Sequence, residues 1–423
     1  MDTKTTKPRV LIVGAGLGAL TLAQGLRKHG IPFEIFERDK DPISRSSGWC
    51  IALHTVNEST SMINDLIASA PDDMPPFRES VDHLVPLDLN AQVGIYRQGM
   101  RLGVESTPDY PVIRANRGRL RKWLSTRVPI QWGKKVVQVE EIGDEVQVRL
   151  EDGTTVTGDI VVGADGVHSV VREYVLQRPN KTILQTVPAA MITGETVVSG
   201  AAFERQLSLG HSSWTVSGPE DSGYYLFVGL RQVSPDGKSG EYYWFIVVRD
   251  ENVDKEDHWL RVASQSEKLR RAFEICQTLD PKYSEIIRLT PPSGMWTSPL
   301  IVRDVELRDL PVGRVTLLGD AVHPMTPFRG EGGVHAIIDA LNLGKALGRL
   351  KSTDIDSIKA IVGPYQEEII ERGVSAVRVC RYAQNVNSGG KGEMIVWSKI
   401  ATPMPEEKIS LGTAPFLKRT SHI

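Results

Sequence analysis

The chain is 423 residues long, which exceeds what one ordinary hydrophobic core holds, so we expect two packed units. Its Lys and Arg residues number 50 and its Asp and Glu residues 52, a formal net charge of -2 that leaves no positive excess for binding nucleic acid. With 40% hydrophobic and 24% charged residues, the composition is that of a folded globular protein and excludes general disorder.

The cysteines and the N-terminal residues indicate the compartment. Cys50, Cys276 and Cys380 are odd in number and lack metal-ligand spacing, so we expect neither a disulfide framework nor a metal site. The first residues lead directly into a strand-like run instead of a secretory signal. No stretch approaches the ~18 consecutive apolar residues of a spanning helix. We therefore expect a cytoplasmic protein with no transmembrane segment.

The N-terminal region reads as a strand, a turn, a helix and a second strand. Residues 9–13 are β-branched and bounded by glycine, residues 17–28 have helical apolar spacing, and residues 33–36 form the next strand-like run. This order predicts a βαβ unit. Residues 62–109 are irregular and rich in Pro, Asp and Ser, and we interpret them as connections plus part of a second unit.

The following segment predicts a helix and then a hairpin. Residues 117–127 have helical spacing. Residues 135–150 alternate as in a strand, turn at 151–153, and continue into a buried strand over 154–162.

The pattern changes between about residues 179 and 292. Two long aromatic and β-branched runs, 224–228 and 242–248, flank a turn at 234–237 and predict a largely antiparallel sheet. The strand and helix pattern then returns with a strand over 314–318 and a helix over about 333–350.

Together these elements predict an α/β fold: a discontinuous Rossmann-like nucleotide-binding domain, an inserted and mostly antiparallel β-sheet domain for substrate, and a helical C-terminal segment that includes residues 356–382. We assign residues 1–82, 110–178 and 293–350 to the nucleotide domain, residues 83–109 and 179–292 to the sheet domain, and residues 351–423 to a C-terminal helix and tail.

The turn after the first strand has the form G-x-G-x-x-G/A. Gly14 permits the tight turn, Gly16 lets the backbone approach a pyrophosphate, and Ala19 keeps the helix close to the strand. The helix N-terminus adds free N–H groups and a positive dipole end for the phosphates. The same glycines also occur for packing alone, so this motif by itself is weak.

Glu37 supplies the context for that turn. It ends the second strand, 19 residues past Gly18, where an acid takes the adenosine ribose hydroxyls. An acid at this position favours a free 2′-hydroxyl, and hence FAD or NAD over NADP. The alternative is a solvated charge at a strand end.

Two further strand ends carry an aspartate. Asp165 lies in the turn Gly-Ala-Asp-Gly at 163–166, either beside a ligand or as the cap of a strand-to-helix corner. Asp320 lies past the strand at 314–318, where open α/β sheets bind ligands. The loop after it, rich in proline and glycine from Pro324 to Gly333, presents backbone N–H groups suited to a cofactor edge that gains negative charge.

These three motifs, in this order over roughly the first 350 residues, resemble the single-component (group A) FAD-dependent monooxygenases. That family is typified by para-hydroxybenzoate and salicylate hydroxylases, and the resemblance is closest to its fungal secondary-metabolite branch. It implies that the nucleotide domain is an FAD-binding domain. It further implies that Glu37 is the acid on the adenosine ribose and that Asp320 binds the ribityl chain.

The resemblance carries over to other positions of the site. Arg117 resembles the arginine that contacts FAD, although it also fits an exposed cation at a helix start. Gly48 matches a point where the chain passes close to the cofactor. Asp165 implies contact with the pyrophosphate region and with NAD(P)H. The segment from Pro327 through Gly332 to Gly333 resembles the one beside the isoalloxazine, with the Gly333 amide at its pyrimidine edge.

One position departs from the family pattern. Many relatives place an asparagine after this glycine segment, and its side chain reaches the flavin; the residue here is Val334. The backbone amides remain, but that extra hydrogen bond is absent.

The reaction implied by the resemblance needs FAD, with NADPH or NADH as a transient co-substrate. Reduced FAD takes up O₂ as a C4a-hydroperoxide, which hydroxylates or epoxidises an electron-rich aromatic or alkene substrate; Baeyer–Villiger insertion stays open. The flavin carries the chemistry, so no catalytic side chain is assigned. The expected partners are a small-molecule substrate and O₂.

Three other functions remain. A flavin-dependent halogenase shares the scaffold, but its Trp-x-Trp-x-Ile-Pro motif is not matched at residues 296–299. Another flavin oxidoreductase or a redox-silent FAD-fold binding protein also fits.

No motif between 179 and 292 specifies a substrate. Trp214, Tyr225 and Trp296 are pocket candidates, although each also fits a sheet core, and His54 and His335 fit structural roles.

Overall fold

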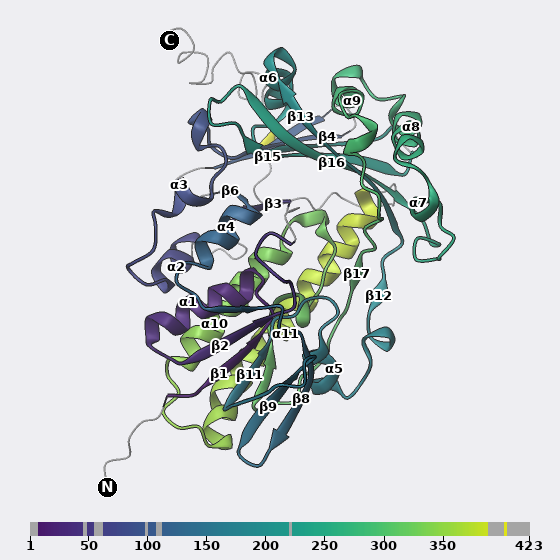
Figure 1. Cartoon of the computed structure of the whole chain (residues 1–423). Helices are drawn as coiled ribbons and strands as arrows, with labels where there is room; N and C mark the ends of the chain where they lie inside the picture. The colour runs from purple at the N-terminus through teal and green to yellow at the C-terminus, as the bar shows by residue number, and fades with distance from the viewer. Residues whose placement is uncertain are drawn as a thin grey trace.

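The computed structural model describes residues 7–44, 49–54, 62–97, 100–106, 112–219, 222–387 and 402–403. These residues form two halves (Figure 1). The lower half has a parallel sheet with long helices beside it, and the upper half has a long twisted sheet with short helices on its outer side.

The lower half is built on a five-stranded sheet in the order β18-β11-β1-β2-β7, with every pairing parallel. Its inner strands are buried runs of Val, Leu and Ile, as expected for a parallel sheet that is covered on both faces. This confirms the predicted Rossmann-like core. The strands are β1 (Val10–Val13), β2 (Phe33–Glu37), β7 (Ile130–Trp132), β11 (Ile160–Gly163) and β18 (Val315–Leu317).

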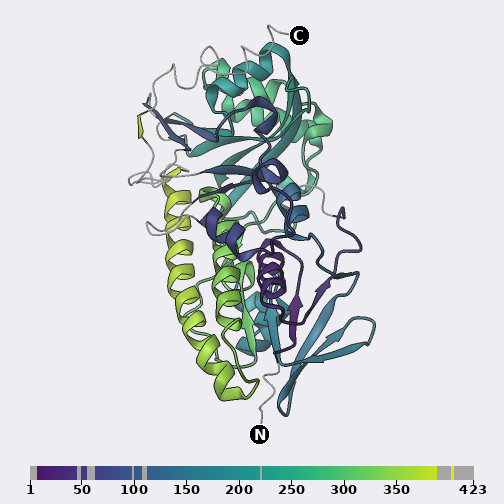
Figure 2. The same cartoon turned by 90° about the vertical axis from the view of Figure 1, so that its left-hand side faces the viewer.

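Close helix packing positions the strand-end loops. Helix α1 (Leu17–His29) packs against α10 (Gly332–Leu347), and a Cβ added at Gly25 would come within 3.9 Å of the Gly344 Cα. The long helix α11 (Ile355–Asn387) lies beside α10, as both views show (Figure 2). Glycine at these contacts therefore lets two backbones meet at the edge of the sheet.

The upper half contains a seven-stranded sheet in the order β13-β16-β15-β14-β4-β5-β19. All of its pairings are antiparallel except β14 with β4. The strands are β4 (Gln92–Arg97), β5 (Met100–Glu105), β13 (Ala189–Ser199), β14 (Ser213–Ser217), β15 (Tyr224–Val233), β16 (Ser239–Arg249) and β19 (Thr402–Pro403).

Smaller elements complete the fold. The helices are α2 (Met62–Ser69), α3 (Phe77–Val81), α4 (Arg117–Leu124), α5 (Val170–Leu176), α6 (Gly200–Leu209), α7 (Trp259–Val262), α8 (Gln265–Cys276) and α9 (Pro281–Arg288). The strands are β3 (Cys50–Leu53), β6 (Ile113–Asn116), β8 (Val136–Ile142), β9 (Glu145–Leu150), β10 (Thr155–Gly158), β12 (Gln185–Thr186) and β17 (Arg303–Asp304).

The structure differs from the sequence-based expectation at three places. The run 135–150 is two strands, β8 and β9, because Gly143 turns the chain with a φ of 61°. Residues 62–109 contain the helices α2 and α3. The stretch 179–292 holds the helices α6 to α9 as well as sheet, and α8 begins with a capping box at Ser264.

The domain boundaries stay a prediction. The parallel sheet takes its strands from residues 10–163 and 315–317, and the seven-stranded sheet from 92–105, 189–249 and 402–403. Over the residues that the structure describes, no helix combines the length and apolarity needed to cross a membrane.

Candidate functional site

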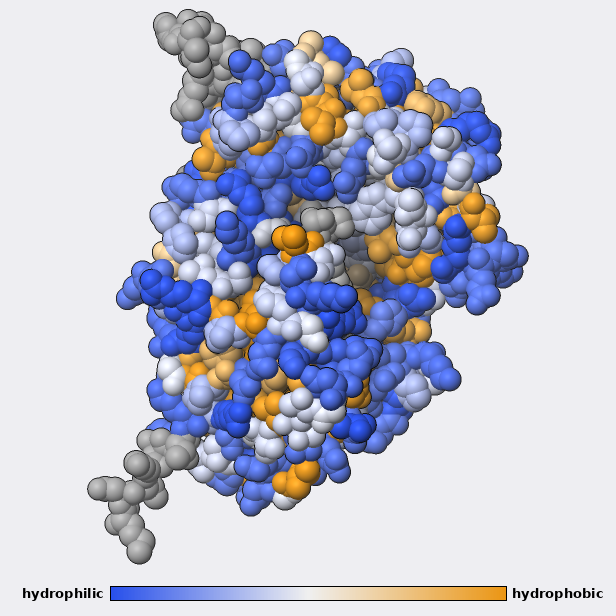
Figure 3. Space-filling model, in the orientation of Figure 1, coloured by the Kyte–Doolittle hydropathy of each residue, from blue (hydrophilic) through white to orange (hydrophobic). Residues whose placement is uncertain are grey.

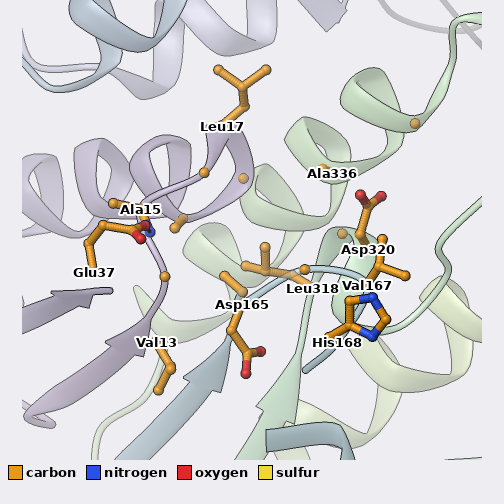
Figure 4. A pocket seen from close by; sticks show the side chains of 18 of the residues that line it. Val13, Ala15, Leu17, Glu37, Asp165, Val167, His168, Leu318, Asp320 and Ala336 are labelled. Atoms are coloured by element: carbon orange, nitrogen blue, oxygen red, sulfur yellow. Dashed lines mark hydrogen bonds between the residues drawn. The ribbon is translucent and has the colours of Figure 1, made fainter. Parts of the chain in front are cut away.

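The three sequence motifs meet at one cavity of about 610 Å³, within the ~300–1,000 Å³ range of cofactor-sized sites. It opens at the carboxyl ends of β1, β2, β11 and β18 (Figure 4). On the face drawn in Figure 3, a hollow lies between the two halves, with hydrophobic residues at its border. Predicted cofactor residues that line the cavity are Gly14, Gly16, Ala19, Glu37, Arg117, Asp165, Asp320, Pro327, Gly332 and Gly333. Gly48 lies outside the described residues.

The glycines of the first turn have different tasks. Gly14 has a φ of 98°, and a Cβ there would lie 2.5 Å from the Ala164 carbonyl oxygen. A Cβ at Gly18 would lie 2.6 Å from Leu318 Cδ1. A Cβ at Gly16 would meet no protein atom within 4 Å, although this residue lines the cavity. Packing therefore explains Gly14 and Gly18, whereas the open side of Gly16 leaves room for a ligand.

Glu37 braces the same turn. Its carboxylate accepts hydrogen bonds from the backbone N–H groups of Ala15 at 2.8 Å and Asp39 at 2.9 Å, and the residue is only 7% exposed. It is therefore not a solvated strand-end charge. Each carboxylate oxygen keeps a second lone pair, so the group can still accept a bond from a hydroxyl in the cavity.

Two helices direct free N–H groups into the cavity. Neither α1, which follows Gly16, nor α10, which begins at Gly332, has a side-chain cap. The carboxylate of Glu331, at the start of α10, pairs instead with Arg329 at 2.6 Å. Uncapped helix N-termini present unpaired donors and a positive dipole end, so both ends suit a ligand with two separated electron-rich parts.

Asp165 caps the next helix. Its carboxylate accepts bonds from Ser169 Oγ at 2.5 Å and from the Val170 N–H at 2.7 Å, and it points away from Glu37 and Asp320 (Figure 4). Burial raises the pKa of Asp165, and these hydrogen bonds oppose that rise. The capping interpretation thus accounts for the Asp165 side chain, while its backbone borders the cavity.

Asp320 faces the cavity from the end of β18. The residue is exposed toward the cavity, yet the surrounding walls shield it from bulk water, and this burial raises its pKa above the usual value. The positive charges of His323, Arg117 and Arg172 oppose the rise. Arg117 begins α4, whose cap is the Asn116 side chain, which accepts bonds from two backbone N–H groups. Asp320, a hydrogen-bond acceptor, and Arg117, a cation, thus both line the cavity.

Arg172 ties two of the motif loops together, a role that the sequence analysis missed. Its guanidinium donates to the carbonyl oxygens of Asp320 at 3.2 Å and Ala321 at 3.1 Å, and also to that of Val167 and to the Asn180 side chain. The residue is 0% exposed, and burial lowers its pKa to about 10. The sequence signal that could have identified Arg172 is its position directly after two valines in the first turn of α5, where a buried arginine needs several acceptors.

A buried ionic network supports the Asp320 loop from behind. Asp339 on α10 accepts bonds from the Gly319 N–H at 2.7 Å, from His323 Nε2 at 2.8 Å and from Arg372 at 2.6 Å. Burial alone would raise the pKa of Asp339, but His323 and Arg372 hold it well below its usual value. Burial would lower the pKa of His323, but the Asp339 carboxylate outweighs it and raises that pKa.

The three aromatic candidates for the substrate pocket do not all lie on the same face of the seven-stranded sheet. Trp214 is 0% exposed and packs beside Tyr283 of α9, on the outer face of the seven-stranded sheet. Tyr225 lies on the opposite, inner face. Trp296 donates from Nε1 to Glu195 at 3.1 Å, and its ring centroid lies 6.0 Å from that of Trp49. Two of the three candidates thus lie on the side of the cavity.

The two histidines that were given structural roles are buried. His54 is 3% exposed and His335 is 2% exposed. Nδ1 of His335 lies 2.9 Å from Arg372, and burial lowers the pKa of His335 to about 3, so this ring is neutral.

Comparison with known proteins gives the family. The FAD binding domain family matches residues 7–354. The FAD-dependent monooxygenase thnD of Trichoderma harzianum is 49% identical over 378 residues, covering 88% of this chain and 92% of that protein. The chain is a member of the FAD-dependent monooxygenase family. The Aurachin C monooxygenase/isomerase of Stigmatella aurantiaca, another relative, is 30% identical and covers 86% of this chain and 85% of its own.

Two solved structures have the same fold. HpxO of Klebsiella pneumoniae, in complex with FAD and uric acid, superposes with a TM-score of 0.68 at 22% identity, over 97% of this chain and 96% of its own. PqsL of P. aeruginosa, in complex with 2-aminobenzoylacetate, superposes with a TM-score of 0.67 at 19% identity, over 90% of this chain and 97% of its own. FAD fits the present cavity, because Gly16 is open toward it and two uncapped helix N-termini offer donors to electron-rich groups of a ligand.

The first prediction concerns Asp320. Asp320→Ala should weaken FAD binding roughly ten- to hundredfold, since a hydrogen bond to a charged group contributes about 1.5–3 kcal/mol. Titration of FAD-free protein by fluorescence measures this. Asp309→Ala, which removes an exposed acid outside the cavity lining, should bind FAD as the unchanged protein does. Equal FAD affinity in both variants would show that Asp320 does not hold the cofactor.

The second prediction concerns pH. The pKa of His323 is raised in the folded protein, so its contribution to stability is complete below the unfolded pKa of about 6.5 and is lost as the pH rises through the folded pKa. The pKa of Asp339 is lowered in the folded protein, so its contribution to stability is complete above the unfolded pKa of about 3.9 and is lost on acidification. His323→Gln should therefore cost about 3 kcal/mol near pH 6, and less at pH 9.

Denaturant unfolding at several pH values tests this prediction. His29→Gln, at an exposed histidine far from the network, should give a curve parallel to that of the unchanged protein. A His323→Gln deficit that is constant from pH 6 to pH 9 would contradict the predicted coupling to Asp339.

Proposed function

We propose that this FAD-dependent monooxygenase uses NADPH or NADH and O₂ to hydroxylate or epoxidise an electron-rich aromatic or alkene substrate. The observation that carries the proposal is the convergence of the three motif loops on one cavity, beside a sheet whose inner face is rich in aromatic rings. Bound FAD would supply the redox chemistry and the activation of O₂. The protein's own residues bind and orient the reactants.

We place the two ends of FAD by the chemistry of the cavity. The Gly14–Ala19 turn and the N-terminus of α1 hold the pyrophosphate, and Glu37 accepts bonds from the adenosine ribose. Asp320 accepts a bond from the ribityl chain, with Arg117 close to it. The amides at Gly332 and Gly333 face the pyrimidine edge, and the α10 dipole stabilises negative charge there.

FAD binds tightly in this proposal, whereas NADPH or NADH binds only transiently. The described strands carry a single glycine turn of the dinucleotide type, at β1, and FAD occupies it. NADPH or NADH therefore reaches the flavin from solvent and leaves again.

The relatives favour a role in secondary metabolism. Beside thnD, the chain is similar to the FAD-dependent monooxygenases cctM of Talaromyces islandicus and phnB of Penicillium herquei, at 27% and 26% identity. We infer that the substrate is an intermediate of such a pathway. The three cysteines, all buried and unbridged, support a reducing cytoplasmic setting.

The third prediction tests the reaction. Supplied with NADPH or NADH and a substrate that stimulates its oxidation, the FAD-loaded protein should add one oxygen atom from O₂ to the product. Mass spectrometry after reaction under ¹⁸O₂ measures this, with H₂¹⁸O under ordinary air as the control. A labelled atom from water, incorporation of halide, or desaturation without oxygen gain would each contradict monooxygenation.

A further inference from the structure

The cavity extends past Glu37 to the neighbouring strand β7. Strand β7 pairs with β2 in the parallel sheet, and Trp132 at its end is the register partner of Glu37. The turn after Trp132 is tied to the end of β2, because the Gly133 N–H donates to the Asp39 carbonyl oxygen at 2.7 Å and the Lys134 N–H donates to that of Glu37 at 2.8 Å. Asp39 and Lys134 both line the cavity. The cavity therefore continues beyond the carboxylate that we assign to the adenosine ribose.

Arg121 reaches this end of the cavity from helix α4. Its Nε donates to the Ala15 carbonyl oxygen at 3.1 Å, and its Nη1 donates to the Pro42 carbonyl oxygen at 3.3 Å. Ala15 belongs to the first glycine turn, and both Ala15 and Arg121 line the cavity. The two acceptors are neutral carbonyl groups, so neither compensates the charge of the guanidinium.

One face of the Arg121 guanidinium is covered by an aromatic ring. Its central carbon lies 5.1 Å from the centroid of the Trp132 ring. Arg121 lines the cavity and Trp132 does not, so the guanidinium lies between the indole and the cavity. A planar guanidinium that stacks on one ring can take a second ring on its opposite face. The arrangement therefore suits a flat, electron-rich ring that lies next to Glu37.

A bracing role explains only part of what Arg121 offers. The bonds to Ala15 and Pro42 use two of the five N–H donors of the guanidinium. A lysine could also donate to the Ala15 carbonyl oxygen. It has no planar face, however, and the face is what the position between Trp132 and the cavity makes available to a ligand.

We propose that Arg121 binds the adenine ring of FAD, which stacks on the guanidinium face opposite Trp132. This inference rests on the proposed function, in which the adenosine ribose lies at Glu37, and it adds the residue that recognises the base. Adenine is bonded directly to that ribose, so a ribose at Glu37 brings the base to the ends of β2 and β7. Arg121 thereby favours FAD over FMN, which has the flavin and one phosphate but no adenine.

The affinities of FAD-free protein for FAD, FMN and ADP test the proposal. Flavin fluorescence measures the binding of FAD and FMN, and competition with FAD measures that of ADP. ADP shares the adenosine and two phosphates with FAD, whereas FMN lacks the adenosine. In Arg121→Met, we expect the dissociation constants for FAD and ADP to rise about two- to thirtyfold relative to that for FMN, the usual scale of a cation–π contact.

Two further variants separate stacking from charge and from folding. Arg121→Lys keeps the charge and a donor for Ala15 but has no planar face, so it should recover only part of the preference for FAD over FMN. It also supplies the same comparison of ligands if the methionine variant does not fold. Lys122→Met removes a charge from the next, exposed position of α4, outside the cavity lining, and should leave all three dissociation constants unchanged.

The outcomes distinguish this inference from the proposed function. An equal rise of all three dissociation constants in Arg121→Met would overturn the proposal, because a residue that only braces the glycine turn affects every ligand with a phosphate there. Unchanged constants in that variant, or full recovery in Arg121→Lys, would also overturn adenine stacking on Arg121. Unsubstituted protein that binds no FAD, or that adds no oxygen from O₂, would overturn the proposed function instead.

Discussion

The guanidinium of Arg172 is the interaction on which the arrangement of the site depends. It lies between two loops that are about 150 residues apart in the chain and donates to backbone carbonyl oxygens of both. A rigid fork of donors can satisfy several buried carbonyls at once, which a lysine at this position would not do. With these loops held, Asp320 and the turn at Gly163–Gly166 face the same cavity as the first glycine turn. Removal of this arginine would leave buried acceptors without donors on both loops.

Charge inside the fold is used in two ways. The buried carboxylate of Asp339 is satisfied by three partners, His323, Arg372 and the Gly319 N–H, and it thereby fixes the backbone at Gly319. Around the cavity, by contrast, no side chain caps the N-termini of α1 and α10, so their backbone donors stay open to a ligand. A folded protein tolerates such unpaired groups where a ligand completes them. The uncapped helix ends therefore suit the electron-rich parts of a bound cofactor.

The fold and most of the cofactor site could be predicted from the sequence because they follow from local patterns. A buried apolar run, a glycine turn and a helix specify a βαβ unit, so Gly14, Gly16 and Glu37 were found together. Long-range contacts were not accessible in this way. Nothing in the spacing of Arg172 or Asp339 indicates that the first joins two loops and that the second supports one of these loops from behind.

The central claim is that one cavity, formed by three strand-end loops, holds FAD with its flavin ring toward the inner face of the seven-stranded sheet. A crystal structure of the protein with FAD tests it most directly. The account predicts the adenosine ribose at Glu37, the pyrophosphate over Gly16, and the flavin ring at Gly332 and Gly333. FAD in a different place, or a flavin ring directed away from the inner face of the seven-stranded sheet, would contradict it.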